Sequence, residues 1–178
     1  MPTAARARLL ATAERLFHAE GVRAVGVERL LAESGVGRAS FYRHFPGKDD
    51  LVLAVLEDRL ARWRTAFAAA VAARGGGVAA VFEELDAQAA DPAFRGCAAI
   101  NAMVEAADRS RPEHRVAAAH KEALARHLGE LAGDADLGET LLLLVDGALV
   151  GLLRDPAGGA ARRAGAAARR LLGEPALS

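Results

Sequence analysis

The stretch from Leu30 to Leu51 reads LLAESGVGRASFYRHFPGKDDL and decides the fold of the N-terminal part of the chain. Apolar residues at helical spacing predict a short helix over 27–34 and another over 38–45. Gly35-Val36-Gly37 predicts a tight turn between them, because glycine tolerates a left-handed backbone. Pro46 ends the second helix, since proline cannot continue the hydrogen-bond ladder. Two short helices joined in this way predict a helix-turn-helix, whose second helix enters a DNA major groove.

Helices are predicted for the rest of the chain as well. An amphipathic first helix carries Leu9, Ala13 and Leu16 and stops at Gly21, and a long helix runs from Lys48 to the glycine break at 74–77. Further helices are expected over 78–90, 97–107, 113–132, 137–154 and 160–172. The sequence therefore predicts an all-α protein of about nine helices, with a helix-turn-helix domain over 1–47 and a larger helical domain over 48–178.

Composition and charge agree with this organisation. The chain is 52% hydrophobic but only 4% aromatic, so alanine, leucine and valine must supply the packing, which favours helices over sheets. The net charge is zero, yet the first 48 residues hold eight Lys or Arg and four Glu, which gives 8 − 4 = +4 and leaves −4 for the remainder. This asymmetry is typical of a protein whose basic N-terminal domain binds phosphate groups and whose remaining part does not.

Several classes of protein are disfavoured by what the sequence contains. One cysteine, Cys97, excludes an internal disulfide and a cysteine-based zinc site, and no cofactor or metal is expected. The N-terminus lacks the apolar run of a signal peptide. The apolar stretch Leu141–Leu153 is too short to span a bilayer and carries Asp146. We therefore expect a soluble cytoplasmic protein without a membrane partner.

The Leu30–Leu51 stretch closely resembles the signature of the TetR family of bacterial transcriptional regulators, and the similarity extends upstream through Ala13–Phe17 and Glu20-Gly21. The resemblance covers about the first fifty residues. The remainder is similar only in its helical plan and in Gly96–Asn101, which resembles one subgroup. The resemblance implies a homodimeric repressor that binds a palindromic double-stranded DNA operator and responds to a small-molecule effector. It also implies that the protein is not an enzyme.

The recognition helix supplies most of the predicted DNA contacts. Phe41 and Phe45 lie one turn apart and are expected to face inward. The resemblance, with the residue types, assigns DNA binding to Arg29, Gly37, Arg38, Ala39, Ser40, Tyr42, Arg43, His44 and Lys48. Arginine forks fit guanine or phosphate, and a hydroxyl fits a base edge or a phosphate oxygen. Tyr42 and Lys48 resemble the family's phosphate clamps, whereas His44 fits a helix cap equally well.

Three departures from the family pattern bear on this surface. Gly26, Gly37 and Gly47 stand at expected N-cap positions where Ser or Thr is common, so a hydroxyl contact to phosphate is lost at each. Arg6, Arg29 and Lys48 are then expected to carry more of the backbone contact. Glu28 is an acid near the DNA face; it suits cytosine N4, but pairing with Arg29 or Arg43 is favoured.

The second domain carries small and aliphatic residues on its last two helices, and this pattern predicts an apolar surface. The resemblance to the TetR family implies that this surface dimerises within a regulatory and dimerisation domain over 48–178, through Leu142, Val145, Leu149, Leu152, Ala161, Ala164, Ala168 and Leu171. A cavity for a small molecule is expected among Trp63, Phe67, Phe82, Cys97, Asn101, Val104, Glu105 and His120, each of which also fits plain core. Cys97 fits a buried thiol or a redox-active one.

Two other classes of protein compete with the regulator. An enzyme is disfavoured, because the sequence shows no phosphate-binding loop, no metal-spaced ligand set and no nucleophile with an obvious base. A helical scaffold with a purely structural helix-turn-helix stays open, as does activation in place of repression.

Overall fold

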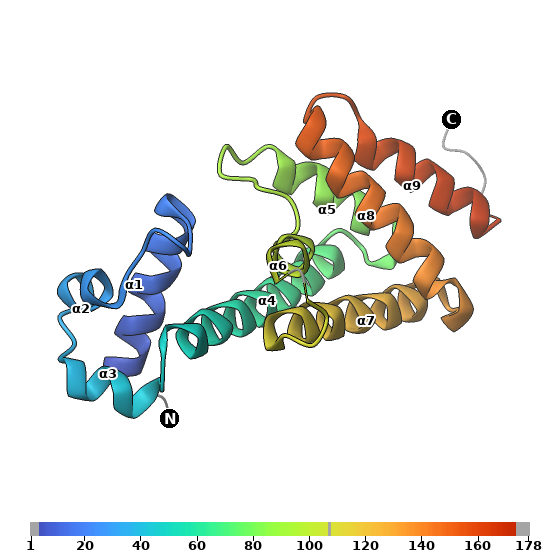
Figure 1. Cartoon of the computed structure of the whole chain (residues 1–178). Coiled ribbons are helices and arrows are strands. Elements are labelled where there is room, and N and C mark those ends of the chain that lie inside the picture. Colours follow the sequence, from blue (N-terminus) through green and yellow to red (C-terminus); the bar gives the residue numbers. More distant parts are fainter. Residues whose placement is uncertain (1–3, 107, 174–178) are drawn as a thin grey trace. The chain divides into compact units, whose positions relative to one another are not determined.

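The computed structural model describes residues 4–106 and 108–173, and all regular elements within them are helical (Figure 1). The predictions for residues 1–3, 107 and 174–178 lie outside the described residues. The elements are α1 (Ala4–Glu20), α2 (Val27–Ser34), α3 (Arg38–His44), α4 (Lys48–Ala73), α5 (Gly77–Ala89), α6 (Ala98–Ala106), α7 (Pro112–Ala132), the short 3-10 turn η1 (Ala135–Leu137), α8 (Gly138–Arg154) and α9 (Ala160–Leu171). The all-α plan of nine helices is thus confirmed for the described residues.

Contacts between residues divide the chain into two compact units, and the division falls between Arg59 and Leu60, inside α4. The first unit therefore includes the opening turns of α4 as well as the helix-turn-helix that was predicted to end at residue 47. The reason is packing: Leu51 is fully buried in the core of this unit, and Ala54 and Val55 lie against it.

The core of the first unit is small and mainly apolar. Leu16 of α1, Leu30 of α2 and Phe41 of α3 are buried together, so each of the three short helices contributes its apolar side. Short helices are marginal on their own, and most of their stability comes from this shared burial. The buried apolar residues of this core are Leu9, Ala13, Leu16, Val25, Leu30, Val36, Phe41, Phe45 and Leu51, and Ser34 of α2 is buried as well.

The turn between α2 and α3 has the predicted geometry. Gly35 adopts the left-handed conformation with φ of 63°, and its N–H donates to the carbonyl of Leu31 over 3.0 Å. A side chain with a Cβ is strained in this conformation, which explains why glycine ends α2. Val36 is buried, and its N–H donates to Ser34 Oγ over 3.3 Å, so the turn fixes the start of α3.

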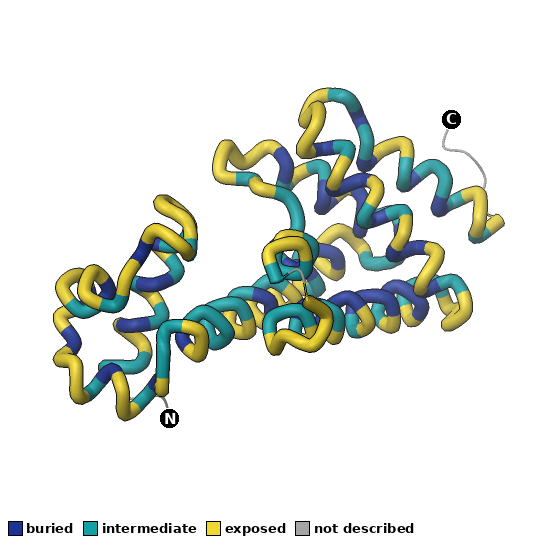
Figure 2. The backbone as a smooth tube through the Cα atoms, in the orientation of Figure 1, coloured by how far each residue is buried: buried dark blue, intermediate teal, exposed yellow. Residues whose placement is uncertain are grey.

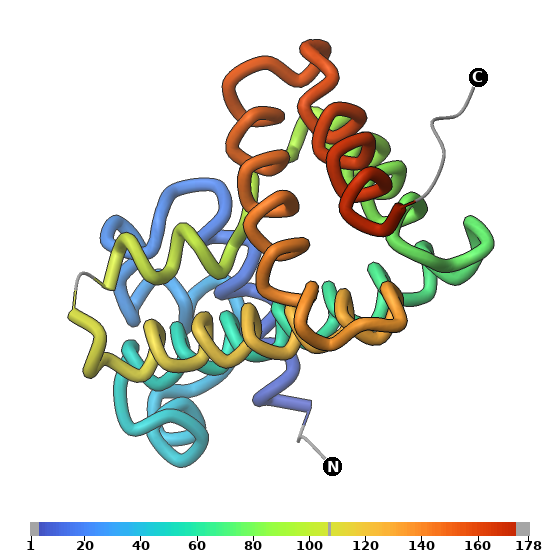
Figure 3. Tube along the Cα trace, turned by 90° about the vertical axis from the view of Figure 1, so that its right-hand side faces the viewer, coloured from blue at the N-terminus to red at the C-terminus, as the bar shows by residue number. Residues whose placement is uncertain are grey.

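The second unit is built around α8, which packs against α5, α7 and α9. Figure 2 shows buried positions recurring along α7 and α8, and Figure 3 shows α8 and α9 lying beside each other. Two glycines permit close packing here. A Cβ on Gly138 would collide with the carbonyl oxygen of Ala125 in α7, and one on Gly165 of α9 would lie 3.0 Å from Cβ of Phe82.

Consecutive glycines separate α4 from α5, as predicted, and one further turn, η1, precedes α8. Gly75, Gly76 and Gly77 have φ values of 94°, 73° and 80°, so the predicted break between α4 and α5 is confirmed. The turn η1 was not predicted. It forms because the side chain of Asp134 accepts a hydrogen bond from the N–H of Asp136 over 3.0 Å and starts a tight turn before α8.

The apolar helices are short or interrupted. Among the described residues no single helix combines the length and the apolar character needed to cross a membrane. α4 and α5 meet that test only as a joined pair, by length and composition, and the chain bends by 117° between them. Most of α5 is buried in the core of the second unit, which accounts for its apolar sequence.

Candidate nucleic-acid interface

The recognition helix α3 has one buried face and one exposed face. Phe41 and Phe45 are buried, as predicted, and they anchor the helix to the core of the first unit. On the other face Arg38, Ala39, Tyr42 and Arg43 are exposed, while Ser40 and His44 are partly exposed. The inward anchor therefore leaves a continuous outward surface of arginine, tyrosine and small side chains.

Tyr42 is exposed but not loose. Its ring packs edge-on against buried Phe41, with ring centroids 5.1 Å apart and an interplanar angle of 85°, while 47% of the residue is accessible. The edge-to-face contact already restricts the ring of Tyr42, so the side chain loses little further freedom when it contacts another molecule. Tyr42 is thus a rigid, amphipathic group on the outward face of α3.

Two cations, Arg43 and Lys48, follow Tyr42 in the sequence. The Nη2 atom of Arg43 donates to Ser40 Oγ over 3.0 Å, so this long side chain is held along α3. Lys48 is the first residue of α4, and Asp49 and Asp50 follow it in the first turn. The free N–H groups at a helix start carry partial positive charge, which adds to that of Lys48. Both cations suit an anion such as phosphate.

Glu28 and Arg38 form an ion pair on the exposed side of the first unit. The carboxylate of Glu28, in the first turn of α2, accepts a hydrogen bond from Nη2 of Arg38, the first residue of α3. The hydrogen bond and the charge of Glu28 raise the pKa of the Arg38 guanidinium above its usual range. The predicted pairing of Glu28 with Arg29 or Arg43 is wrong, because Arg29 is engaged by two other carboxylates and Arg43 by Ser40.

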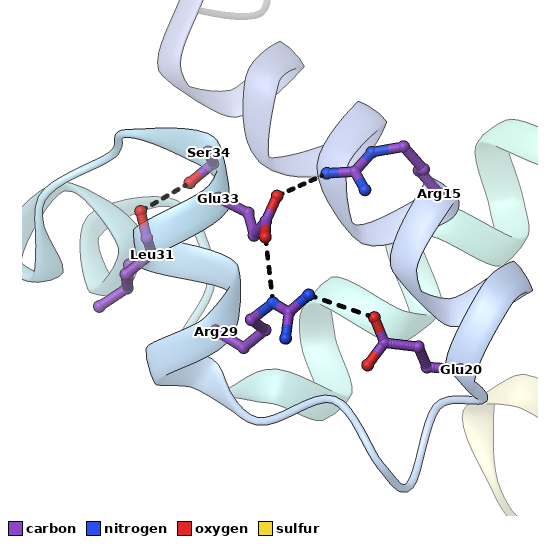
Figure 4. Close-up of polar contacts among 6 residues, drawn as sticks. All are labelled: Arg15, Glu20, Arg29, Leu31, Glu33 and Ser34. Atoms are coloured by element: carbon purple, nitrogen blue, oxygen red, sulfur yellow. Dashed lines mark hydrogen bonds and ion pairs between the residues drawn. The ribbon is translucent and has the colours of Figure 1, made fainter.

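Arg29 forms ion pairs with two carboxylates of the first unit. Its guanidinium bonds Glu33 over 3.1 Å and Glu20 over 3.4 Å, and Glu33 also bonds Arg15 of α1 over 2.9 Å (Figure 4). The hydrogen bond from Arg15 is the main cause of the lowered pKa of Glu33. This surface network joins α1 to α2 and uses Nε and Nη2 of Arg29, which leaves Nη1 as a donor for a phosphate oxygen.

The N-caps of α2 and α3 are Gly26 and Gly37, as predicted, and neither residue offers a side chain to cap its helix. A phosphate oxygen suits the first-turn N–H groups of a helix chemically. Arg6 of α1 also belongs to this region, because its guanidinium lies 5.5 Å from the ring centroid of Phe45.

In the second unit the structure brings together three of the predicted cavity residues. Trp63 stacks on Phe67 with centroids 4.5 Å apart, and His120 meets the Trp63 ring edge-on at 5.5 Å. Phe82 is buried elsewhere, against Gly165 of α9, and Cys97 lies at the edge of the same core. These residues come from α4, α5, α7 and the segment before α6.

The α6 part of the cavity prediction is wrong. Asn101 and Glu105 are exposed and Val104 is 73% accessible, so these side chains line no enclosed space. Asn101 uses its amide to donate to the carbonyl of Arg95 over 3.1 Å. These two polar residues, one turn apart on an apolar helix, lie on its solvent-exposed face. The same sequence pattern fits a polar cavity wall equally well, so the sequence did not distinguish the two.

Sequence reasoning also missed the buried polar groups of the second unit. Glu84 accepts hydrogen bonds from Arg74 and Gln88 over 3.0 and 2.9 Å, and Gln88 accepts one from the Trp63 indole over 3.2 Å. Lys121 of α7 pairs with Asp146 of α8. Asp146, within the apolar run of α8, was the available signal for this second pair, since a partly buried carboxylate among apolar residues favours a cation as its partner.

His120 is the most perturbed group of this unit. It is buried, and burial together with the nearby charges of Arg64 and Lys121 lowers its pKa to about 4. Its Nδ1 lies 3.3 Å from Nη1 of Arg64. A neutral imidazole accepts a hydrogen bond from the guanidinium through this nitrogen, which is the arrangement that the lowered pKa favours.

The predicted dimer residues need correction. Leu142, Val145, Leu149, Leu152, Ala161 and Ala168 are buried in the core of their own protomer, and only Ala164 and Leu171 retain partial or full exposure. The helical period was right, but the buried stripe of α8 faces α5, α7 and α9 of the same chain. The accessible apolar side chains of α8 are instead Leu143, Val150 and Leu153.

The first unit, taken by itself, defines a helix-turn-helix DNA-binding protein, and comparisons with known proteins specify which kind. Residues 9–55 match the model for bacterial regulatory proteins of the tetR family. A TetR-family transcriptional regulator from Streptomyces coelicolor has a similar crystal structure, with 36% identity, a TM-score of 0.81 and coverage of 97% of this chain and 90% of that one. The chain belongs to the TetR family of transcriptional regulators, which are not enzymes.

Other relatives agree over different lengths. A putative TetR transcriptional regulator from Streptomyces avermitilis is 30% identical, with a TM-score of 0.79 and coverage of 97% of this chain and all of that one. NemR of E. coli is 20% identical with a TM-score of 0.80 and shows a shared fold. An HTH-type transcriptional regulator of Staphylococcus aureus is 37% identical over 62 residues, and that match spans 35% of this chain and 34% of the relative.

Proposed function

We propose that the protein is a homodimeric repressor that works in the cytoplasm, binds a palindromic DNA operator through α3, and releases it when a small molecule binds the second unit. The observation that carries the proposal is the two-sided α3. Buried Phe41 and Phe45 fix the helix, and its exposed face presents Arg38, Tyr42 and Arg43. A fixed basic helix in a helix-turn-helix fits a major groove.

The roles within this surface follow from side-chain chemistry. Arg38 and Arg43 suit guanine O6 and N7, and Gly37, Ala39 and Ser40 are small enough for the helix to approach base edges closely. Tyr42, His44, Lys48 and Arg29 suit phosphate oxygens, which set the register on the duplex without reading sequence. Ser40 holds Arg43 in the free protein, so the arginine is oriented before DNA arrives.

The first experiment selects duplexes from a random pool and measures their affinity at several salt concentrations. We expect selected sites with two related half-sites. Lys48→Ala should weaken binding of all duplexes and reduce the salt slope by about 1 per protomer. Arg43→Ala should in addition reduce discrimination by about 1–3 kcal/mol. Arg126→Ala, which removes an exposed arginine from α7 in the second unit, serves as the control and should change neither.

The outer face of α8 supports the homodimer. Leu143, Gly147, Val150 and Arg154 recur at intervals of four, three and four residues, the spacing by which one helix packs along another. Leu143 is 72% accessible and Val150 is 58% accessible. These residues line an open groove of about 320 Å³ between α8 and α9, and a Cβ placed on Gly147 would meet open space. A second copy presenting the same face fits this surface.

Gly147→Glu tests the dimer without disturbing the fold of one protomer, because the new side chain meets open space. We expect sedimentation to show monomers, since an unpaired carboxylate in an apolar interface is costly. Ala119→Glu, at an exposed position of α7, adds the same charge and should leave the dimer intact. Unchanged dimers in Gly147→Glu, with both variants folded, would contradict the proposed interface.

Ligand response rests on the aromatic group of Trp63, Phe67 and His120. Stacked aromatic rings with one polar edge suit a flat, partly apolar molecule. Trp63 is the single tryptophan of the chain, so its fluorescence reports binding at this place directly. We expect an effector to change that fluorescence and to weaken operator affinity over one concentration range. Deletion of the gene should raise transcription from the operator; a fall would indicate an activator.

A further inference from the structure

The Glu28–Arg38 pair places a carboxylate where a DNA-binding surface would not be expected to have one. The side chain of Glu28 is 73% exposed and that of Arg38 is 58% exposed, so both charges face solvent. Arg38 opens α3, the helix assigned to the groove, and Glu28 stands in the first turn of α2. A negative charge beside phosphates lowers affinity for every duplex, so its presence at this point needs a reason.

We propose that Glu28 is a positioning residue that determines sequence specificity: it holds Arg38 for one guanine of the operator and penalises duplexes that lack it. This inference rests on the proposed binding of an operator by α3. A guanidinium has several N–H donors, and the bond to Glu28 uses Nη2, which leaves other donors for O6 and N7 of guanine. A held arginine loses less side-chain entropy when it binds a base.

The penalty arises from charge. On a duplex without the guanine, Arg38 gains most by turning to a phosphate. That movement removes the cation from Glu28 and leaves an unpaired carboxylate close to the DNA backbone. On the matching duplex the arginine stays beside Glu28, so the pair remains neutral as a unit. Specificity obtained by weakening the wrong complexes is a common device in recognition.

The neighbouring acid of the same helix provides a matched control. Glu33 lies five residues after Glu28, about 140° further around α2, and pairs with Arg15 of α1 and with Arg29. Glu28→Gln and Glu33→Gln therefore remove the same charge from the same helix. Only Glu28→Gln releases a side chain of α3.

The test compares two duplexes of equal length and composition, one selected by the wild type and one scrambled. Glu28→Gln should bind the scrambled duplex more tightly, with a steeper salt slope, and its ratio of selected to scrambled affinity should fall at least about fivefold. Glu33→Gln should leave that ratio within about twofold of the wild type. In an Arg38→Ala background Glu28→Gln should leave the ratio unchanged, because Glu28 acts through Arg38. Circular dichroism verifies that each variant is folded.

Three results would overturn the inference alone. These are an unchanged ratio in folded Glu28→Gln, an equal fall in Glu33→Gln, and a further fall when Glu28→Gln is added to Arg38→Ala. Failure of the wild type to prefer any selected duplex would instead overturn the proposed function, and this inference with it.

Discussion

The two compact units differ in where they place their charged groups. Among the described residues of the first unit no charged side chain is buried, and the ion pairs lie on the surface, where Arg29 joins Glu20 and Glu33, and Arg38 joins Glu28. Water and salt screen such pairs, so each contributes little to folding. They can be exchanged for contacts with an external anion at small cost, which suits a surface that binds and releases DNA.

The second unit keeps polar groups inside. Glu84, His120 and Lys121 are buried, and each has a partner on another helix or the same one: Arg74 and Gln88 for Glu84, Arg64 for His120 and Asp146 for Lys121. A buried polar group left without its partner is costly, so these bonds restrict the helices to one arrangement. The comparison indicates that exposed ion pairs can exchange their partners for an external anion, whereas buried polar pairs fix how the helices pack.

The largest expected effect comes from removing a buried carboxylate. Glu84→Ala should lower the free energy of unfolding by about 3 kcal/mol, because two hydrogen bonds to a buried charged group are lost, while the exposed Arg74 left behind becomes hydrated. Denaturant unfolding followed by circular dichroism measures this. Glu84→Gln keeps the shape of the side chain and should cost less. If Glu84→Ala costs under about 1 kcal/mol, the buried pairs of the second unit are no stronger than surface pairs, and the comparison fails.

Acid should destabilise the second unit through His120. Its pKa is about 4 when folded and about 6.5 when unfolded, so between these values the unfolded chain takes up a proton that the folded chain does not. Stability should therefore fall as the pH drops from about 6.5, with a loss of up to about 3 kcal/mol below about pH 4. His120→Gln should remove this slope, whereas His18→Gln, at an exposed position of α1, should keep it.

A smaller effect separates two glycines of α8. Gly138→Ala should cost about 1–3 kcal/mol, since its Cβ collides with the backbone of α7 at Ala125. Gly147→Ala meets open space and should stabilise the protomer by up to about 1 kcal/mol through helix propensity. Thermal unfolding of both variants at a concentration where the dimer is absent gives the comparison. Equal effects would mean that α7 and α8 are not closely packed at Gly138.

The smallest effect belongs to the surface network. Glu33→Ala breaks the bonds to Arg15 and Arg29, yet it should leave the midpoint of denaturant unfolding almost unchanged at moderate salt, because water and salt screen these exposed pairs. The same denaturant titration measures it, at two salt concentrations. A cost as large as that of Glu84→Ala would show that the network is structural and not available for exchange.

Periodicity and turn residues predicted the helices well, for physical reasons. Gly35, Pro46 and the 75–77 glycines act through local backbone sterics, which depend on few neighbours. The two phenylalanines of α3 were also placed correctly, because a short helix can bury only one face. The bounds of α2 were also predicted correctly, because Gly26 and Gly35 flank it and Gly35 ends it in the left-handed conformation.

Predictions that depended on which partner covers an apolar stripe were weaker. The helical period of α8 places Val145 and Leu149 together on one stripe, but the sequence does not say whether α5 or a second copy covers them. Likewise Asn101 and Glu105 share a helix face whose exposure depends on distant residues. The pairing of Glu28 with Arg38 also required the angle between α2 and α3, which only the folded turn supplies.

The three glycines between α4 and α5 have a consequence for chemical synthesis of the chain. Positive φ throughout this turn is the region that mirror-image amino acids occupy without strain. A D-alanine in place of Gly76 should keep the turn and restrict only the unfolded chain, whereas L-alanine there should strain the backbone. The chirality of this one residue is thus expected to change the stability of the protein without altering the side-chain contacts described above.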